Sequence, residues 1–383
     1  MAKQSIYLDH AAGAPIDKEV EKIVFDATAF FANPSGLHEE GIAVRQKIEE
    51  ARKQIASSIG ATAAEIIFTG NGTESNNLAL RGLLSGNRQQ HIVTTNIEHS
   101  SVLETCRQLV KDGVAVTFVP VEKNGIVDPK KIKEALQPNT ILVSVMHANN
   151  EIGTIQPIGE IAKIIRAFRK EKNGALPYFH TDAVQAFNYL PTNVEKLGVD
   201  LLTLNGSKIY GPRGIGILYK RKGTPLEPIL FGGNQEKGLR PGTENTPAIL
   251  GLALAAKITA ALREKERARL AELQDYFLKK LEESGLPFAL NGDRASRLPN
   301  NVNISIAILS GDIWVIELSA RGIAVSSKSA CKEGSDAESY VINALGGRSR
   351  ESLRFSFGRT TRENDIDAAI AALRDIFDKY AKI

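Results

Sequence analysis

Two residues of this chain, Lys208 and Cys331, have the type and the setting for covalent chemistry. Lys208 lies in the run Asn205-Gly-Ser-Lys-Ile-Tyr-Gly-Pro-Arg-Gly214, between the apolar stretches 199–204 and 215–219. The glycines and the proline predict a rigid turn that holds the lysine at the end of a buried strand. An amine beside apolar walls loses hydration, so its pKa falls and the neutral form can make a Schiff base with a carbonyl. A surface lysine in a hairpin would show the same pattern.

Cys331 lies in the run Ser326-Ser-Lys-Ser-Ala-Cys-Lys-Glu-Gly-Ser-Asp336, whose small polar residues predict an exposed loop. Lys328 and Lys332 flank it, and nearby cations lower the pKa of a thiol and favour the thiolate. A thiolate on such a loop could reach a substrate and then carry sulfur away, although an idle surface cysteine would fit the loop as well. Cys106, in contrast, lies among apolar residues of a predicted helix and is expected to be buried.

The run Thr69-Gly-Asn-Gly-Thr-Glu-Ser-Asn-Asn77 has the composition of an anion site. It follows a predicted strand and opens a predicted helix, so Gly72 and Thr73 stand where backbone N–H groups attract negative charge. Phosphate is the expected occupant. The run lacks the Gly-Lys-Ser/Thr of a P-loop and the spacing of a dinucleotide-binding turn. A glycine-rich connection without a ligand is the alternative interpretation.

Asp182 stands at the end of the predicted buried strand 178–181 and is followed by Gln185. A buried carboxylate requires a cationic partner. The protonated pyridine nitrogen of pyridoxal 5′-phosphate (PLP) is one such partner, and this nitrogen must stay protonated for the ring to withdraw electrons. A helix N-cap at Asp182 would explain the same residue.

His99 and Asn150 also follow predicted strands, and Arg354 lies within another. His99 could stack on a ring or move a proton, although a single histidine at a strand end is often structural. Arg354 alternates with Leu353 and Phe355, so it faces the opposite side of its strand and could bind a substrate carboxylate with two hydrogen bonds. A surface ion pair is the competing explanation for Arg354.

The positions of these residues depend on a predicted sheet. The strand candidates are Ile66–Thr69, Ile92–Thr95, Val114–Val119, Ile141–Met146, Tyr178–Thr181, Leu201–Leu204 and Gly216–Tyr219. Helix candidates separate them, at Glu74–Leu84, Ser101–Lys111, Pro129–Leu136 and Ile158–Lys172. This alternation predicts an α/β fold with a mostly parallel sheet covered on both faces and one antiparallel edge. Ligands of such sheets bind beyond the carboxyl ends of the strands, so the convergence of these residues there is stronger than any single motif.

A long helix over 247–283 and a second α/β pattern follow. The strands are expected at Val302–Leu309, Ile323–Ser326 and Leu353–Phe357, and the helices at Ile313–Ala320, Tyr340–Leu345 and Glu363–Tyr380. Together with its 383 residues, this pattern predicts a second, smaller domain.

Composition narrows the class of protein. The chain has 48 basic and 44 acidic residues, a net charge of +4 without a basic patch, so no nucleic-acid partner is expected. The start predicts no signal peptide, and the longest apolar run, 248–256, is too short for a membrane span. Two cysteines indicate a reducing, cytoplasmic location rather than a disulfide framework, and the six scattered histidines predict no metal site.

Taken together, the chain resembles the NifS/IscS-type cysteine desulfurases, PLP-dependent enzymes of the class V aminotransferase group. The resemblance extends from Tyr7 to about Arg359. It rests on the runs Tyr7-Leu-Asp9, Asn33-Pro-Ser35, Thr73-Glu-Ser-Asn-Asn77, Glu98-His99, Asn149-Asn-Glu-Ile-Gly153, Asp182-Ala-Val-Gln185, Lys208-Ile-Tyr-Gly-Pro-Arg-Gly-Ile-Gly216, Arg240-Pro-Gly-Thr-Glu-Asn245, Ser329-Ala-Cys331 and Arg354-Phe-Ser-Phe-Gly-Arg359.

The resemblance implies the PLP-dependent transferase fold type I (aspartate-aminotransferase-like) and a homodimer. A large PLP-binding domain with a mostly parallel seven-stranded sheet would comprise residues 14–260. Residues 1–13 and 261–383 would form the small domain that carries the catalytic cysteine.

The same resemblance implies a role for each site residue. Lys208 would hold PLP as a Schiff base and, with His99, move the substrate's α-proton. Asp182 would pair with the pyridine nitrogen, Gln185 with the ring oxygen, and His99 would stack on the ring. The phosphate ligands would be Gly72, Thr73, Asn205 and Ser207, with Thr243 from the second subunit. Asn150 would contact the cofactor and, with Arg354, the substrate carboxylate.

The implied reaction removes sulfur from L-cysteine. The Cys331 thiolate would attack the substrate sulfur, leaving a persulfide on Cys331 and releasing L-alanine. The persulfide would pass to an acceptor in iron–sulfur cluster or thio-cofactor biosynthesis, such as an iron–sulfur scaffold or a tRNA-thiolation enzyme. A selenocysteine lyase or another class V aminotransferase-type enzyme is the alternative, and a non-catalytic sulfur-carrier-binding module is a third reading.

The chain departs from the family pattern at two residues. Ser207 stands where the family usually has histidine, which predicts weaker PLP binding, and Lys328 stands where it usually has glycine, which adds a charge near the thiol. Some relatives dock an iron–sulfur scaffold through a long C-terminal tail. The sequence given ends at Ile383 without that tail, so the resemblance does not imply docking of a scaffold in this way.

Overall fold

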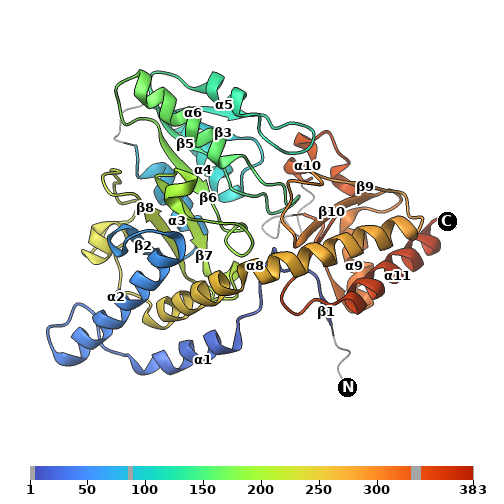
Figure 1. Cartoon of the computed structure of the whole chain (residues 1–383), viewed down its shortest axis with the longest axis horizontal. Coiled ribbons are helices and arrows are strands. Elements are labelled where there is room, and N and C mark those ends of the chain that lie inside the picture. The colour runs from blue at the N-terminus through green and yellow to red at the C-terminus, as the bar shows by residue number, and fades with distance from the viewer. Residues whose placement is uncertain (1–4, 85–88, 329–337, 383) are drawn as a thin grey trace.

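The computed structural model describes residues 5–84, 89–328 and 338–382 (Figure 1). Cys331 and its neighbour Lys332 lie outside these residues.

A seven-stranded sheet, here called the large sheet, carries most of the predicted site residues. Its strands are β2 (Ile66–Thr69), β3 (His91–Thr95), β4 (Ala115–Val119), β5 (Thr140–Ser144), β6 (Tyr178–Asp182), β7 (Leu201–Asn205) and β8 (Gly216–Lys220). Their spatial order is β2-β8-β7-β6-β5-β3-β4. Only β8 runs against its neighbours, pairing antiparallel with both β2 and β7. The predicted strands are confirmed, and antiparallel pairing is found at one side of the sheet, although the antiparallel strand β8 lies inside the edge strand β2.

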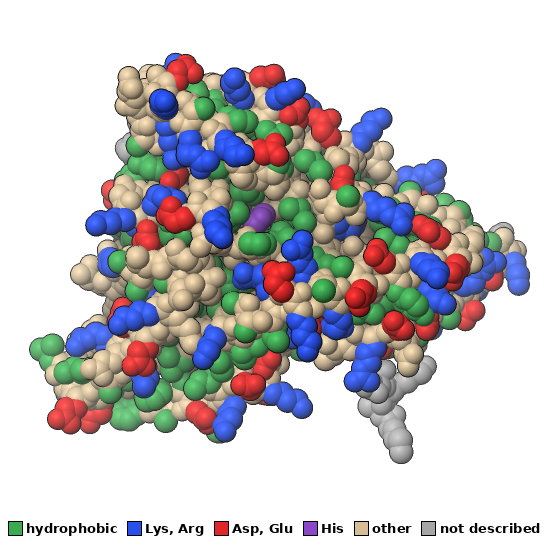
Figure 2. Space-filling model, in the orientation of Figure 1, with side chains coloured by type: hydrophobic (Ala, Val, Ile, Leu, Met, Phe, Trp, Pro, Cys, Tyr) green, Lys and Arg blue, Asp and Glu red, His purple; other side chains and the backbone are tan. Residues whose placement is uncertain are grey.

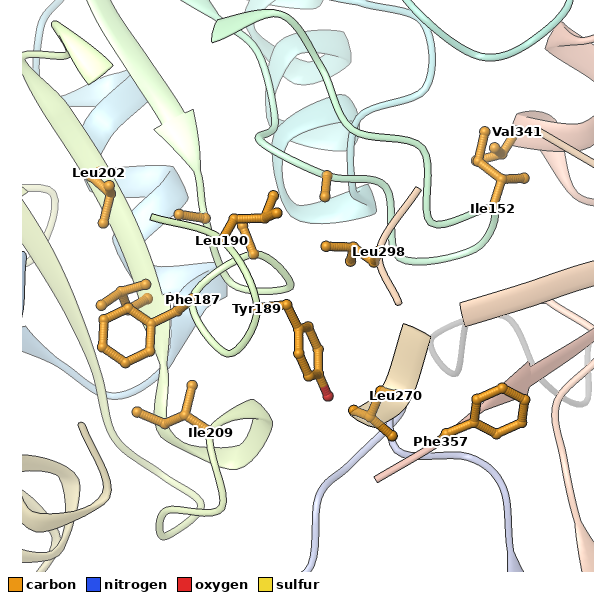
Figure 3. Packing of buried hydrophobic residues seen from close by; sticks show 14 of the residues in the cluster. Ile152, Phe187, Tyr189, Leu190, Leu202, Ile209, Leu270, Leu298, Val341 and Phe357 are labelled. Atoms are coloured by element: carbon orange, nitrogen blue, oxygen red, sulfur yellow. The ribbon is translucent and has the colours of Figure 1, made fainter. Parts of the chain in front are cut away.

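Helices cover both faces of the large sheet because successive strand residues point to opposite sides. In β3, Ile92 packs in a cluster with the apolar residues of α3 and α4, whereas Val93 belongs to the larger cluster shared with α2, α6 and α8 (Figure 3 shows part of this larger cluster). The helices before and within this region are α1 (Lys18–Asp26), α2 (Glu39–Ile59), α3 (Gly72–Arg81), α4 (Ser100–Lys111), α5 (Pro129–Ala135), α6 (Ile158–Glu171) and α7 (Val194–Leu197).

Helix α8 (Thr246–Glu283) runs from the large sheet to the C-terminal part of the chain (Figure 1). There a three-stranded antiparallel sheet, the small sheet, has the order β12-β10-β9. Its strands are β9 (Phe288–Leu290), β10 (Asn301–Ile306) and β12 (Ser352–Ser356), and its helices are α9 (Gly311–Ala320), α10 (Tyr340–Ala344) and α11 (Glu363–Tyr380). The N-terminal strand β1 (Ile6–Tyr7) joins this part by pairing with β11 (Ile323–Ala324). The short strand β9 was not predicted.

Among the described residues, one helix has the length and composition to cross a membrane, and it is α8. Half of its apolar window, 50%, is buried inside the protein, where α8 packs against α1, α2 and α11. The core helix of a water-soluble fold passes the same test of length and composition, so the apolar character of α8 is accounted for by its packing.

Candidate active site

Most of the predicted site residues line one pocket at the carboxyl ends of the parallel strands. The pocket encloses about 700 Å³, part of it open to solvent. The predicted residues in its wall are Gly72, Thr73, His99, Asn150, Asp182, Gln185, Asn205, Lys208 and Arg354. Ala11, Ala12, Asn76, Ser101, Met146 and Val184 complete the lining. The strand-end argument therefore predicted which residues lie together in this pocket.

The turn after β7 directs Lys208 into this pocket. The turn is too tight for a side chain at Gly206, where a Cβ atom would lie 2.5 Å from the carbonyl oxygen of Pro212. Asn188 donates a hydrogen bond from Nδ2 to the backbone oxygen of Lys208 at 2.7 Å, and the Lys208 ammonium donates to the carbonyl oxygen of Ala12. The lysine is thus held from both its backbone and its amine, and it is not a surface residue of a hairpin.

Asp182 ends β6 as a buried carboxylate that has only neutral donors. Its Oδ2 accepts from Asn76 Nδ2 at 2.8 Å and its Oδ1 from the backbone N–H of Val184 at 3.0 Å. Within the described residues, no lysine or arginine forms an ion pair with it. Residues 183–189 form turns rather than a helix, so Asp182 does not cap a helix there. A carboxylate left in this state suits a cationic ligand group.

His99 is oriented by a short chain of hydrogen bonds. It is the N-cap of α4, where its Nδ1 accepts from the backbone N–H of Ser101 at 3.2 Å. The hydroxyl of Ser101 lies 2.7 Å from the same Nδ1 and accepts from Asn76 Nδ2 at 2.8 Å. Because Nδ1 accepts from a backbone N–H, we assign the proton of the neutral ring to Nε2. Asn76 thereby connects His99 with Asp182.

Asn76 and Ser101 were not assigned a role from the sequence, although Asn76 lies in the Thr73-to-Asn77 run. A signal was present: in a helix that begins at Gly72, residue 76 falls one turn later and on the same face. Ser101 follows His99 too closely to have suggested a separate role.

The first turn of α3 lies where the anion site was predicted. Gly72 stands against Asn205 and Val184, since a Cβ atom there would lie 3.3 Å from Val184 Cγ2 and 3.4 Å from Asn205 Cβ. The close approach leaves the N-terminus of a ten-residue helix directed at the pocket. Ser207 and Thr243, the other predicted phosphate ligands, are outside the pocket's lining, and Thr243 is exposed.

Arg354 is almost fully buried and already has two partners. Its Nη2 lies 2.7 Å from Asp9 Oδ1, and its Nη1 donates to the backbone oxygen of Asn150 at 3.0 Å. Its Nε and the Oδ1 of Asn150 have no hydrogen-bond partner in the structure. The arginine is therefore not a surface ion pair, and these atoms remain to receive a polar ligand. Gln185, another residue of the lining, donates from Nε2 to the Ala11 oxygen at 3.0 Å.

Glu98 directly precedes His99 in the chain. The carboxylate is fully buried, accepts from Thr95 Oγ1 at 2.7 Å, and has both oxygens 3.0 Å from the Met146 backbone nitrogen. Burial raises the pKa of Glu98 from its ordinary value of 4.5 to about 8, and the nearby charge of Asp182 acts in the same direction. The cysteine outside the site, Cys106, is buried as predicted, and burial raises the pKa of its thiol.

Comparison with known proteins gives one consistent result. Residues 6–369 match the family model described as aminotransferase class-V. A protein named cysteine desulfurase IscS from Dictyoglomus turgidum is 43% identical, covering 100% of this chain and 96% of that protein. A putative cysteine desulfurase IscS 1 from Bacillus subtilis is 42% identical, covering 97% of this chain and 98% of that protein. A solved NifS-like protein superposes with a TM-score of 0.90 at 31% identity, covering 98% of this chain and 100% of its own.

Proposed function

Since this chain belongs to the aminotransferase class-V family, we propose that it is a PLP-dependent cysteine desulfurase. The observation that carries the proposal is the pocket that joins Lys208, the buried Asp182 and Arg354 at one sheet edge. Full-length relatives named cysteine desulfurase and NifS-like solved structures support the same reaction.

The residues present fit PLP. Asp182 lacks a cationic partner among the described residues, the N-terminus of α3 is open to a phosphate, and Lys208 reaches the space between them. PLP, when bound, supplies an electron sink for negative charge next to the substrate's α-carbon. We propose that Lys208 binds it as a Schiff base and that Asp182 keeps the ring nitrogen protonated. Gln185 would contact the ring oxygen, and His99 would stack on the ring.

The residues proposed to bind the phosphate and the substrate are chosen by their positions in the pocket wall and by the family resemblance. Gly72, Thr73, Asn205 and Ser207 are the proposed phosphate ligands, and Asn150 is proposed to contact both cofactor and substrate. Arg354 would receive the substrate carboxylate at Nε, while Asp9 and the Asn150 backbone hold the guanidinium in place. The amine of Lys208 would then move the α-proton, with the Nε2–H of His99 as a second donor.

The sulfur step is proposed for Cys331, which lies outside the described residues. Its thiolate would form an S–S bond with the substrate sulfur while the C–S bond breaks. The electron pair left on the substrate carbon takes up a proton, so L-alanine leaves and Cys331 keeps a persulfide. An acceptor such as an iron–sulfur scaffold or a tRNA-thiolation enzyme would remove that sulfur in the cytoplasm.

We also propose a homodimer, and a division into a large domain of residues 14–260 and a small domain of residues 1–13 and 261–383. Large apolar side chains are exposed at Phe25 (75%), Phe31 (87%) and Leu37 (87%), and Figure 2 has hydrophobic side chains gathered at the lower left, over α1 and α2. Exposed apolar patches of this kind support an interface with a second copy. Thr243 is exposed, so it is available to reach the second subunit's phosphate.

The test is to supply the PLP-loaded protein with L-cysteine and a thiol reductant, which reduces the persulfide and releases its outer sulfur as sulfide, and to measure alanine and sulfide. We expect both products in equal amounts, and Cys331→Ala to keep the PLP absorbance but lose sulfide release. Sulfide release at the wild-type rate from Cys331→Ala would contradict the assigned nucleophile. Alanine with selenide from selenocysteine, but none from cysteine, would instead favour a selenocysteine lyase.

A further inference from the structure

The part of the chain that carries Cys331 is anchored at both ends by described residues. Lys328 precedes Cys331 by three residues, and Ser339 follows it by eight. Ser327, Lys328, Glu338 and Ser339 line a common pocket, so the two anchored ends face one another.

The first end is fixed to the C-terminal part of the protein. Ser327 Oγ donates to Asp312 Oδ1 at 2.6 Å, and Lys328 Nζ lies 3.1 Å from Asp312 Oδ2. Asp312 belongs to the first turn of α9. Just before this end, the backbone of Ser326 pairs with Arg354 in β12. The charge that Lys328 adds relative to the family pattern is therefore paired with a carboxylate.

The second end is fixed to two segments that each contribute a residue to the wall of the candidate active site. Ser339 Oγ donates to Glu151 Oε2 at 2.5 Å, and Tyr340 Oη donates to the backbone oxygen of Glu98 at 2.5 Å. Glu151 directly follows Asn150, and Glu98 directly precedes His99. Each hydrogen bond thus joins the chain after Cys331 to the neighbour of a pocket residue.

This second attachment, here called the latch (Ser339 and Tyr340 with their two acceptors), is buried except at Tyr340, which is partly exposed. Ser339 and Glu151 are each 1% exposed, and Glu98 is fully buried. Val341, which follows Tyr340, lies beside Ile152, which follows Glu151, in the same apolar cluster (Figure 3). The carboxylate of Glu151 would lose a buried donor if the Ser339 hydroxyl were absent, and such a loss is costly.

We propose that Ser339 and Tyr340 are positioning residues for the desulfuration reaction. They attach the chain that carries Cys331 to the segments of His99 and Asn150. This chain is therefore fixed at residues that directly neighbour two residues of the pocket wall. A tether fixed close to the substrate raises the local concentration of the thiol, and small errors of placement lower the rate of a bimolecular step strongly. The proposal rests on the proposed function, since it concerns the step assigned to Cys331.

The experiment compares Tyr340→Phe with the wild-type holoenzyme. The change removes one hydroxyl and keeps the ring, so we expect the PLP absorbance and the KM for cysteine to stay within about twofold. The single-turnover rate of persulfide formation on Cys331, followed by mass spectrometry, should fall about tenfold. Amide hydrogen exchange in residues 338–345 should rise. Ser339→Ala is the second variant and should show the same division between KM and rate.

Tyr380→Phe is the matched control. Tyr380 Oη donates to Glu317 Oε1 at 2.6 Å. This hydrogen bond is similar in length to that of Tyr340, but it joins α9 to α11 and does not involve a neighbour of a pocket residue. We expect it to leave the persulfide rate unchanged. An equal loss of rate in Tyr380→Phe, an unchanged rate in both latch variants, or a loss of PLP and a raised KM in them would overturn the proposal. A wild-type protein that makes no alanine from cysteine would instead refute the proposed function.

Discussion

The side chain of Asn76 links the carboxylate of Asp182 to the imidazole of His99 through the hydroxyl of Ser101. A hydrogen-bonded chain of this kind fixes both a negative charge and a tautomer before any ligand arrives. The sequence identified the two ends of this chain because a strand-end aspartate and histidine are conspicuous. It did not identify the two residues between them, because the spacing that places Asn76 on the face of Gly72 does not show that α3 packs against α4 and so brings Asn76 to Ser101.

At this scale Glu98 predicts a pH dependence of stability. Its folded pKa of about 8 lies above its ordinary 4.5, so the folded protein holds a proton that the unfolded chain has released. This contribution is complete below about pH 4.5 and is lost as the pH rises to about 8. Glu98→Gln mimics the protonated form. We expect its midpoint of thermal unfolding, relative to the wild type, to increase steadily from about pH 5 to about pH 8.

When Glu98→Gln is compared with the wild type, the effects on stability of the other titrating groups cancel. Burial lowers the pKa of His10 and of His147 to about 4, and these groups destabilise both proteins equally as the pH falls. A difference between variant and wild type that stays constant across this range would show that Glu98 does not hold its proton at neutral pH.

At the scale of elements, the strands of the large sheet were predictable because each is a short apolar run between turn residues. Strand β9 was not, because Phe288–Leu290 is three residues long and is a strand only through its pairing with β10. Contacts between elements that are distant in the sequence were also not predictable in the site. The sequence placed Thr243 near the phosphate by resemblance alone, and the contacts that hold its segment come from distant elements.

Glu236 supplies the main contact of that segment. Its carboxylate forms a bidentate pair with Arg52 of α2, with both N–O distances 2.7 Å, and accepts from the Phe68 backbone of β2 at 2.9 Å. Glu236 has a left-handed backbone with φ of 47°, which costs energy for a residue other than glycine. The pair therefore holds a strained turn against α2 and β2.

We expect Glu236→Ala to destabilise the protein by about 3 kcal/mol, because the buried Arg52 guanidinium would lose its bidentate partner and keep only the half-exposed Glu49 and the Ile66 carbonyl oxygen. Urea unfolding of the holoenzyme would measure the loss. Glu104→Ala is the control, since its pair with Arg107 is exposed at both side chains and should contribute only about 0.5 kcal/mol. Similar losses in the two variants would mean that the buried pair contributes no more than a surface pair.

At the scale of the whole molecule, the pocket within one chain contains most of the predicted residues but not Thr243. Thr243 is exposed on the segment held by Glu236, and exposed apolar side chains lie at Phe25, Phe31 and Leu37. Two copies related by a twofold axis would each lend this segment to the other, because a symmetric interface makes every contact twice.

This arrangement predicts complementation between inactive subunits. Lys208→Ala lacks the cofactor lysine but keeps Thr243. Thr243→Val keeps Lys208 but loses a hydrogen bond from its hydroxyl to the phosphate, which weakens cofactor binding by about 1.5–3 kcal/mol. In a mixed dimer, one site receives Lys208 from one subunit and Thr243 from the other, so it is intact. Random mixing makes half of the dimers mixed, and we expect about a quarter of the wild-type alanine production at saturating cysteine and limiting PLP. Activity that only equals the sum of the two separate variants would show that each pocket is completed within its own chain.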